Sequence, residues 1–382
     1  MNKSIVCYGA GGAYHWVEEV LERRLGHTVI GVIDARFETL RSQFNCPVWS
    51  PSERFANIET EFKLPPTSTL LVALGTKDLC DSVVKKLFEL GWLEARSLNS
   101  YFPSHLGFQV DDFEHEDLDK IIELSSKKID RARKLLSDDL SKLVFDQILN
   151  IYCEKAGQWV AAGCPLDMEL APEFANDVDS SHIIRCGVDA AEISNLLGQD
   201  TVYIKTLTCY EPDPIQLYGN GIWKGLLKES YVRSELNQKT YVKIKPYAVY
   251  SKQGTASFYS SGLEPFLGAK KDPPKTSFGS RISTKGNCTV ETTTLNRDAK
   301  TQQTTLIIID AEGTERDIIL GSIDILRQQR PTVIVAVYHK LPDLWDILIM
   351  LKQLNLNYQF YLRNYTGFVY ETFLYAICHR DN

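Results

Sequence analysis

The stretch Leu306–Glu315 constrains the fold of this 382-residue chain more than any other. Its first four residues are apolar and mostly β-branched, which is typical of a strand buried on both faces of a parallel sheet. Asp310 and Glu312 follow, and Gly313 then permits a sharp turn into a helical pattern. Because ligands bind just beyond the carboxyl ends of strands in open α/β sheets, we expect both acids at a functional site. The alternative is that they cap the following helix.

Composition and charge exclude several classes of function. With 44% apolar and 24% charged residues, the chain has the make-up of an ordinary globular protein with material for more than one core. Its net charge of −7 argues against a nucleic-acid partner, and the lack of an apolar run of about 18 residues argues against a membrane span. The first residues show no signal-peptide pattern, and the nine scattered cysteines form no CxxC pair, so we expect a cytoplasmic protein without a zinc ribbon.

Residues 1–106 predict a small Rossmann-like domain of the nucleotide-binding type. A strand at 4–8 runs into a glycine turn and a helix, a second strand at 28–34 ends in an acid, and a third strand at 68–75 precedes a helix at 78–90. Glycines let the backbone approach a phosphate, and the acid stands where a ribose-binding residue would stand. The candidate nucleotide site consists of Gly9, Gly11, Gly12 and Asp34. A purely structural turn is the alternative, because Tyr14 replaces the third glycine and Arg36 could pair with Asp34.

Residues 107–181 are expected to form a helical connector. Helical periodicity runs from 118 to about 155, with an interruption at 137–139 where a new helix starts. These helices either join the two domains or cover the second sheet. An amphipathic helix of this kind could also form the surface of a homodimer, and the sequence does not separate the two roles.

Residues 182–382 predict a second α/β domain. Strands are expected at the start of 182–191 and at 206–211, 241–250, 253–259 and 332–339, with helices from 315 to about 329 and from 342 to 354. A long, polar and basic loop spans 262–287. Two aromatic-rich strands at 358–363 and 371–377 are joined by a short link, which favours an antiparallel hairpin. The predicted fold class is α/β, with two Rossmann-like domains and a C-terminal antiparallel hairpin.

Five spaced blocks in the second domain resemble the FkbM family of S-adenosylmethionine-dependent methyltransferases. The blocks are Ile309–Glu315, Arg330–Pro331, Val337–Lys340 with Asp343–Trp345, Tyr361–Arg363, and Tyr370–Thr372 with Leu374–Ala376. Gly279–Arg281 and Glu211–Pro214 extend the likeness backwards. The resemblance implies a class I methyltransferase fold, S-adenosylmethionine as cofactor, and O-methylation of a sugar, nucleotide-sugar or natural-product acceptor, as in polysaccharide biosynthesis. The first domain resembles the small Rossmann-like domains attached to sugar-modifying enzymes.

Candidate cofactor-binding residues follow the first two strands of this second domain. The sequence places Glu211 at the end of a strand, where its carboxylate could accept hydrogen bonds from two vicinal hydroxyls such as those of a ribose. By the resemblance, the other cofactor-binding candidates are Gly187, Asp189 and Asp213.

Methyl transfer from a sulfonium needs alignment and a group that removes the proton of the acceptor. Asp310 and His339 end neighbouring predicted strands, and an unperturbed histidine pKa of about 6.5 suits a base near neutral pH. We therefore expect His339 to be the base or to bind the acceptor, with Asp310 as its partner or as the base itself. Glu312 and Arg281 are candidates for holding the acceptor. A structural histidine is the alternative, and the spacing requires no metal, although a carboxylate–histidine cluster could hold one.

Three positions depart from the pattern of the family. Arg185 stands where the strand usually ends in an acid, Ala191 stands in a turn that is usually glycine-rich, and Ile308 replaces a frequent lysine. A guanidinium at that strand end would repel the cationic groups of S-adenosylmethionine. This motivates a second hypothesis, a degenerate methyltransferase-fold module for binding or assembly whose first domain holds a nucleotide or nucleotide-sugar. A nicotinamide-dependent oxidoreductase rests on the first glycine turn and its acid alone and ranks last.

Overall fold

The computed structural model divides the chain into two compact units, each described here by itself. The first unit comprises residues 1–107 with 146–161 and 366–369, and the second comprises 108–145, 162–365 and 370–382. The structure describes residues 4–10, 14, 27–51, 69–74, 77–89, 95–97, 118–152, 172–174, 176–188, 193, 196–197, 203–219, 231–233, 238–260, 263, 280–364 and 371–378. Among these residues, no helix is both long and apolar enough to cross a membrane.

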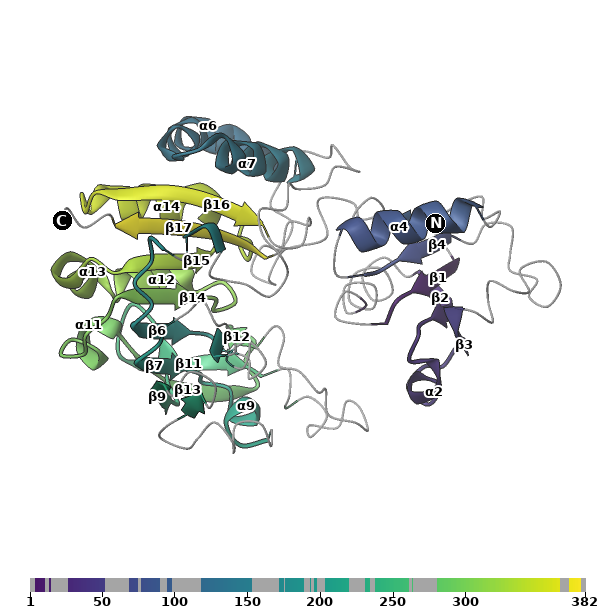
Figure 1. Ribbon diagram of the computed structural model, residues 1–382, viewed down its shortest axis with the longest axis horizontal. Helices are drawn as coiled ribbons and strands as arrows, with labels where there is room; N and C mark the ends of the chain where they lie inside the picture. The colour runs from purple at the N-terminus through teal and green to yellow at the C-terminus, as the bar shows by residue number, and fades with distance from the viewer. Residues whose placement is uncertain are drawn as a thin grey trace. The chain divides into compact units, whose positions relative to one another are not determined.

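The first unit contains a five-stranded parallel sheet in the order β3-β2-β1-β4-β5 (Figure 1). Its elements are β1 (Ser4–Tyr8), β2 (Thr28–Ile33), α2 (Phe37–Leu40), β3 (Val48–Trp49), β4 (Thr69–Val72), α4 (Lys77–Glu89) and β5 (Ala95–Ser97). The predicted strands at 4–8, 28–34 and 68–75 and the helix at 78–90 are confirmed. Of the helix predicted after the glycine turn, only Tyr14 lies within the described residues.

The second unit is built on an eight-stranded sheet in the order β16-β17-β15-β14-β6-β7-β9-β8, of which β16 to β9 can be followed from top to bottom in Figure 1. The strands are β6 (His182–Cys186), β7 (Thr206–Tyr210), β8 (Tyr231–Arg233), β9 (Gln238–Lys245), β14 (Leu306–Ile309), β15 (Thr332–Ala336), β16 (Tyr358–Asn364) and β17 (Thr372–Cys378). Strand β14 pairs in parallel with β6 and β15 and is fully buried, as its apolar run predicts. The predicted C-terminal hairpin is confirmed, because β17 runs antiparallel to β15 and β16.

A smaller four-stranded sheet lies beside the main one, in the order β10-β13-β11-β12. It contains β10 (Ala248–Val249), β11 (Gly254–Tyr259), β12 (Arg281–Ile282) and β13 (Cys288–Thr293), with the short helices α9 (Pro214–Gly219) and α11 (Leu295–Asp298) nearby in sequence. The prediction of a single strand over 241–250 is wrong, because the strand is interrupted between the end of β9 and the start of β10. Two residues of the loop predicted over 262–287 form β12, and residues 264–279 of that loop lie outside the described residues.

The helix predicted from 315 to about 329 is two helices, which is a correction. They are α12 (Glu315–Leu320) and α13 (Ile323–Gln329), followed by α14 (Asp343–Gln353). Gly321 separates them, and a Cβ there would lie 2.2 Å from the carbonyl oxygen of Tyr250. The carbonyl of Gly321 accepts a 2.9 Å hydrogen bond from the backbone of Asn296. Close packing against other segments of the same chain therefore interrupts the helix at this glycine. The helical periodicity of the sequence does not reveal such tertiary contacts.

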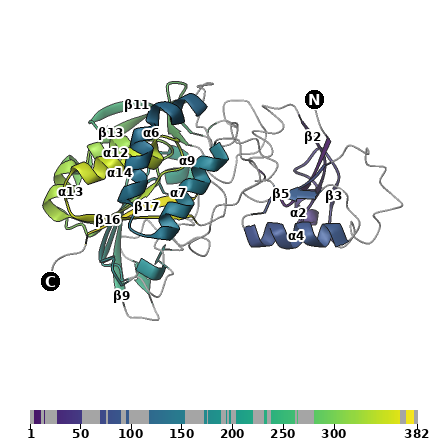
Figure 2. The same ribbon diagram turned by 90° about the horizontal axis from the view of Figure 1, so that it is seen from above.

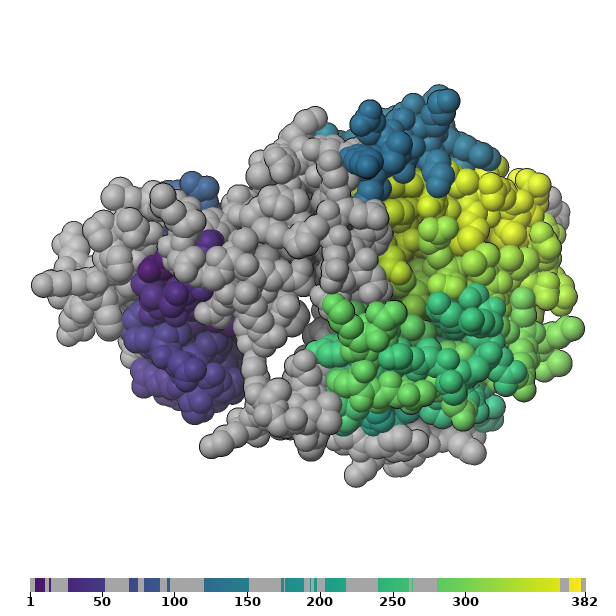
Figure 3. Space-filling model, turned by 180° about the vertical axis from the view of Figure 1, so that it is seen from behind, coloured from purple at the N-terminus to yellow at the C-terminus, as the bar shows by residue number. Residues whose placement is uncertain are grey.

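The connector helices are α6 (Leu118–Leu135) and α7 (Asp139–Tyr152), and the predicted interruption at 137–139 is confirmed. Helix α6 packs against α14, as Figure 2 shows, and in Figure 3 the blue surface of the connector lies against the yellow surface of the C-terminal part of the chain. The turn between the helices pairs with the outer edge of β16, where Ser137 donates its N–H to the carbonyl of Phe360 at 2.8 Å. Leu362 in turn donates to Ser141 Oγ at 2.9 Å. This part of the connector therefore covers the second sheet, which is one of the predicted roles, because it lies along an otherwise open sheet edge.

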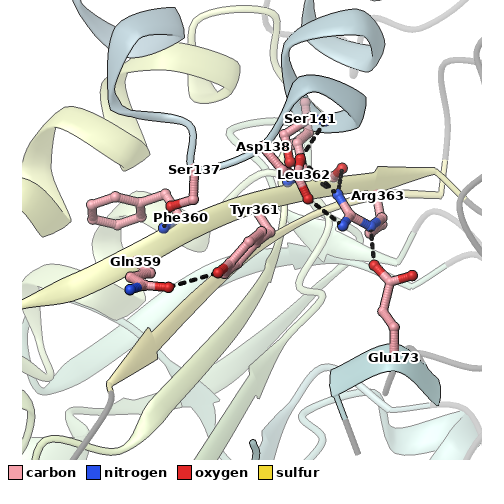
Figure 4. A network of polar contacts seen from close by, with 9 residues as sticks. All are labelled: Ser137, Asp138, Ser141, Glu173, Gln359, Phe360, Tyr361, Leu362 and Arg363. Carbon is pink, nitrogen blue, oxygen red and sulfur yellow. Dashed lines mark hydrogen bonds and ion pairs between the residues drawn. The ribbon is translucent and has the colours of Figure 1, made fainter.

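A buried arginine fastens this turn to the sheet (Figure 4). The side chain of Arg363 on β16 is 4% exposed, and its guanidinium contacts Asp138 Oδ2 at 2.6 Å, Ser141 Oγ at 2.9 Å and the carboxylate of Glu173. Burial opposes the charge of Asp138, but hydrogen bonds from Arg363 and Ser141 outweigh it and lower the pKa of Asp138. The connector is therefore held by a charged network as well as by apolar packing.

Candidate active site

Three parallel strands of the second unit end side by side and place the candidate residues. Strands β6, β7 and β14 are neighbours, and Gly187, Glu211 and Asp310 are the residues that directly follow them. Gly187 donates its N–H to the carbonyl of Tyr210 at 3.1 Å, and Asp310 donates to the carbonyl of Cys186 at 2.9 Å. The backbone therefore fixes these three positions at one edge of the sheet.

Gly187 is required at this edge by the space around it. Its φ is +78°, and a Cβ would lie 1.6 Å from the carbonyl oxygen of Asp310. No side chain fits at that distance, and the left-handed backbone conformation itself disfavours other residues. The glycine predicted as a cofactor-binding residue thus lets the end of β6 approach the end of β14.

A cleft opens beyond these strand ends. Four carboxylates line it, from Glu211, Asp310, Glu312 and Glu371, together with the guanidinium of Arg281. Its apolar lining includes Val188, Ala248, Val249, Phe258 and Ile282. Among the described residues, the lining is therefore acidic on one side and apolar on the other. An acidic lining favours cationic or hydroxyl-rich ligands.

The carboxylate of Glu211 is held in place by backbone N–H groups. Val188 donates to its Oε2 at 3.0 Å, and Asp213 donates to its Oε1 at 2.7 Å. Each carboxylate oxygen has two acceptor positions, so these bonds orient Glu211 while leaving it able to accept from a ligand hydroxyl. The side chain that the sequence marked as ribose-binding is thus preoriented at the cleft.

Asp213, also predicted to bind the cofactor, does not line the cleft. It is fully buried, and its Oδ1 accepts hydrogen bonds from the backbone of Ile215 at 2.8 Å and from Ser260 Oγ at 2.9 Å. It therefore ties the end of β7 to the smaller sheet. The remaining cofactor candidate, Asp189, lies outside the described residues.

Two of the acidic residues in the cleft have strained backbones. Glu312 and Glu371 have φ values of +52° and +58°, in the left-handed region that non-glycine residues rarely adopt. Strain of this kind gathers at functional sites, where the surrounding structure holds it. Neither the strain nor the place of Glu371 in the cleft is visible in the sequence, although Glu371 stands in one of the blocks quoted above.

Asp310 is the centre of the acidic side. The hydroxyl of Tyr338 lies 3.3 Å from both of its carboxylate oxygens and 3.5 Å from Glu371 Oε1. His339 Nε2 lies 3.5 Å from Asp310 Oδ1 and 3.4 Å from Glu312 Oε2. The structure therefore brings together the predicted residues Asp310, Glu312 and His339. It adds Tyr338, whose place next to His339 was the available sequence signal.

His339 is buried against a second, deeper carboxylate. Its Nδ1 lies 2.8 Å from Oε1 of Glu315, which is fully buried and also accepts from the backbone of Ala311 and Gly313. Burial opposes a charge on His339, but Glu315 and then Glu312 more than offset it and raise the pKa of His339 to about 10. An imidazole that is protonated at neutral pH donates from both nitrogens and does not take up a proton. The geometry thus favours a positioning role for His339 over that of the base.

A further buried acid, Asp343, stands behind this pair. Burial and then the charge of Glu315 raise the pKa of Asp343 to about 7. Glu315 and Asp343 were not predicted as site residues. Glu315 follows Asp310 by five positions, so the run of three acids was a usable signal, whereas the approach of Asp343 depends on where α14 packs.

Of the two arginines that the sequence analysis placed at the site, Arg281 lies where it was predicted and Arg185 does not. Arg281 on β12 lines the cleft as predicted, with its guanidinium 5.2 Å from the ring centre of Tyr259. Arg185 is 1% exposed and does not line the cleft. Its register with Cys209 and Ile308 puts its side chain on the sheet face that carries the main apolar cluster. The interpretation that Arg185 would stand beside the cofactor is therefore wrong, because alternation along β6 turns it into the core.

The first unit has its own glycine turn. Gly9 has a φ of +98°, and Ala10 donates its N–H to Asp34 Oδ2 at 2.8 Å. Arg36 contacts both carboxylate oxygens of Asp34, with Nε at 3.0 Å and Nη2 at 3.1 Å. This pairing matches the structural alternative weighed from the sequence. Gly11 and Gly12, the other nucleotide candidates, lie outside the described residues.

Two comparisons with known proteins found a match, one to a family model and one to a solved structure. Residues 203–360 match the family model described as the methyltransferase FkbM domain. The crystal structure of methyltransferase FkbM from Methylobacillus flagellatus KT matches with a TM-score of 0.64 at 17% sequence identity, covering 98% of this chain and 90% of that chain. No curated protein matches the chain. At that identity the structural match shows a common fold, and the family match spans the segment that carries Glu211, Asp310, Glu312 and His339.

Proposed function

We propose that the chain, whose residues 203–360 match the model of the FkbM methyltransferase family, transfers a methyl group from S-adenosylmethionine to an acceptor hydroxyl. The proposed acceptor is a sugar, a nucleotide-sugar or a natural product. The observation that carries the proposal is the acidic cleft at the carboxyl ends of β6, β7 and β14. The strand order, with a final antiparallel pair, also supports the predicted class I methyltransferase fold.

The residues of the cleft suit the proposed cofactor. Glu211 offers a carboxylate, fixed by two backbone bonds, to a pair of ribose hydroxyls. Ala248, Val249 and Phe258 provide apolar contact of the kind that a purine ring needs. The net negative lining favours a sulfonium and an ammonium group. When bound, S-adenosylmethionine would supply an activated methyl group, which the acceptor oxygen would take in line as the thioether sulfur leaves.

The acidic side of the cleft suits the acceptor and its proton. Asp310 is the carboxylate that we assign as the base, because it lines the cleft and is oriented by Tyr338 and His339. His339 acts as a positioning residue, since Glu315 holds its Nδ1 and its Nε2 faces Asp310 and Glu312. Glu312, Glu371 and Arg281 remain to bind other hydroxyls of the acceptor. In this assignment the hydroxyl proton moves to an Asp310 oxygen as the acceptor oxygen gains the methyl group.

Mass spectrometry tests the proposal directly. The full chain is incubated with S-adenosylmethionine and a panel of sugars, nucleotide-sugars and hydroxylated natural products, and the products are searched for one added methyl group. We expect a methylated product that Asp310→Asn reduces by roughly a hundredfold or more, the usual range for a general base. The matched control is Asp324→Asn, an exposed acid on α13. Full activity of Asp310→Asn would remove this residue as the base, and no methylation across the panel would count against the acceptor classes.

The second hypothesis, a degenerate binding module, loses the observation that motivated it. It rested on Arg185 standing in the cofactor site, and Arg185 does not line the cleft. The nucleotide site proposed for the first unit has its acid paired with Arg36. Neither observation favours the module over the enzyme.

A further inference from the structure

Four carboxyl groups gather around His339, and two of them are buried. Asp310, Glu312, Glu315 and Asp343 surround one imidazole, and the last two acids are 0% and 1% exposed. Glu315 Oε2 and Asp343 Oδ1 are both buried without a hydrogen-bond partner. Buried charges in proteins are normally paired or coordinate a metal, so a group of carboxylates around one imidazole is a candidate metal site.

The distances around His339 Nε2 match those between the ligands of one metal ion. Asp310 Oδ1 and Glu312 Oε2 lie 3.5 Å and 3.4 Å from this nitrogen. Charge-assisted hydrogen bonds are shorter, about 2.7–2.9 Å. Two ligands at about 2.1 Å from a tetrahedral metal are separated by about 3.4 Å. The spacing therefore suits an ion held between the three groups better than a direct bond between any two of them.

The other ring nitrogen has the partner that a metal-binding histidine normally has. Nδ1 of His339 faces Glu315 at 2.8 Å, and Glu315 is itself fixed by the N–H groups of Ala311 and Gly313. Such a carboxylate sets the orientation of the ring and holds the proton on Nδ1, so an ion that binds Nε2 takes the place of the proton there. Asp310, Glu315 and His339 also each offer an atom such that all three lie within 4.8 Å of one another.

We propose that this cluster is a divalent metal site, with His339 Nε2, Asp310 and Glu312 as ligands and Glu315 as the carboxylate that orients His339. One imidazole with two carboxylates suits Mn²⁺ or Zn²⁺ better than the all-oxygen sites that Mg²⁺ and Ca²⁺ prefer. Asp310 and Glu312 line the cleft, so an acceptor hydroxyl there reaches the ion. The role of the ion rests on the proposed function: it lowers the pKa of the acceptor hydroxyl. Asp310 binds the ion through one carboxylate oxygen, and its other oxygen takes up the hydroxyl proton as the acceptor oxygen gains the methyl group and the thioether sulfur leaves.

Titration of the metal-stripped full chain with Mn²⁺ tests the site, with free Mn²⁺ followed by electron paramagnetic resonance. Neither S-adenosylmethionine nor acceptor is present. We expect saturable binding of one ion per chain, abolished by His339→Gln and weakened at least about tenfold by Glu312→Gln and by Glu315→Gln. Glu312 is 31% exposed, so its variant tests the site with little disturbance of the core. Asp324→Asn is the control and should bind as the wild type does.

Two results would overturn the metal site. One is the lack of saturable Mn²⁺ and Zn²⁺ binding at millimolar concentrations by the folded wild-type chain. The other is binding that Glu312→Gln and His339→Gln leave unchanged while their circular dichroism stays that of the wild type. Because cofactor and acceptor are absent, either failure leaves the methyltransferase proposal intact. Conversely, a chain that binds Mn²⁺ at these residues but transfers no methyl group supports the site and counts against the proposed function.

Discussion

The two units share one local arrangement, in which a strand runs into a glycine turn and an acid follows the next strand. They differ in the surroundings of that acid. In the first unit, β1 runs into Gly9 and Asp34 directly follows β2, whereas in the second unit β6 runs into Gly187 and Glu211 directly follows β7. Both glycines have positive φ, and both acids accept a hydrogen bond from the residue after the glycine. The carboxylates then differ, because Arg36 contacts both oxygens of Asp34, while Glu211 lines a cleft.

The difference shows that a strand, a glycine turn and an acid do not by themselves make a binding site. A guanidinium two residues after Asp34 neutralises the acid within its own loop. Glu211 is followed by a proline. Its carboxylate accepts a hydrogen bond from the backbone N–H of Asp213, which is two residues later in the sequence, as Arg36 is after Asp34. A backbone N–H orients a carboxylate, whereas the guanidinium of Arg36 orients Asp34 and also supplies a counter-charge.

Alanine at the two glycines gives the largest expected effect. Gly187→Ala places a Cβ 1.6 Å from the carbonyl of Asp310, and we expect a loss of roughly 2–4 kcal/mol in stability from the left-handed backbone and the overpacking, together with loss of S-adenosylmethionine binding. Gly9→Ala meets the carbonyl of Ala73 at 2.5 Å in the other unit and should leave that binding intact. Thermal unfolding and calorimetry measure both. Wild-type cofactor affinity in Gly187→Ala would break the comparison.

The second largest effect is expected at one arginine of each unit, where the loss of stability on replacement by alanine should differ. Arg363 is 4% exposed and holds the connector turn on β16, so Arg363→Ala should cost roughly 2–4 kcal/mol by leaving its acids unpaired. Arg36 is 57% exposed, and Arg36→Ala should cost less than about 1 kcal/mol. Chemical denaturation of both variants gives the two free energies of unfolding. Equal losses would show that burial does not govern these pairs.

The pH dependence of stability sharpens the same contrast. Pairing with Arg363 lowers the pKa of Asp138, so its contribution is present above the unfolded value of about 4 and is lost as the pH falls through the folded value. Asp138→Asn should therefore lower the melting temperature near neutral pH and flatten its fall below about pH 4. Melting curves between neutral and acid pH check this. An unchanged acid slope in the variant would rule out Asp138 as a source of that slope.

The smallest effect is expected from the acid of the first unit. Asp34 is already paired, so a thermal-shift panel of NAD, UDP-sugars and S-adenosylmethionine should show no shift that Asp34→Ala removes. A clear stabilisation by NAD or a UDP-sugar that disappears in Asp34→Ala would restore the nucleotide site predicted from the sequence.

Apolar runs and the acids after them were enough to predict the parallel strands and to bring Glu211, Asp310 and Glu312 to one cleft. The predictions from sequence were wrong or incomplete where tertiary packing determines the structure. Arg185 lies in a strand with both faces buried, so its apolar neighbours do not reveal which way it points. The helix break at Gly321 depends on a carbonyl of a distant segment. The pairing of His339 with Glu315 likewise requires knowing where β15 ends relative to α12.

Isothermal titration of S-adenosylmethionine into the full chain tests the central claim most directly, with Glu211→Gln and Asp34→Asn as the paired variants. The account predicts one cofactor bound per chain, an affinity weakened roughly 10–100-fold in Glu211→Gln by loss of charged hydrogen bonds, and no change in Asp34→Asn. No binding at millimolar cofactor, or a loss confined to Asp34→Asn, would contradict it.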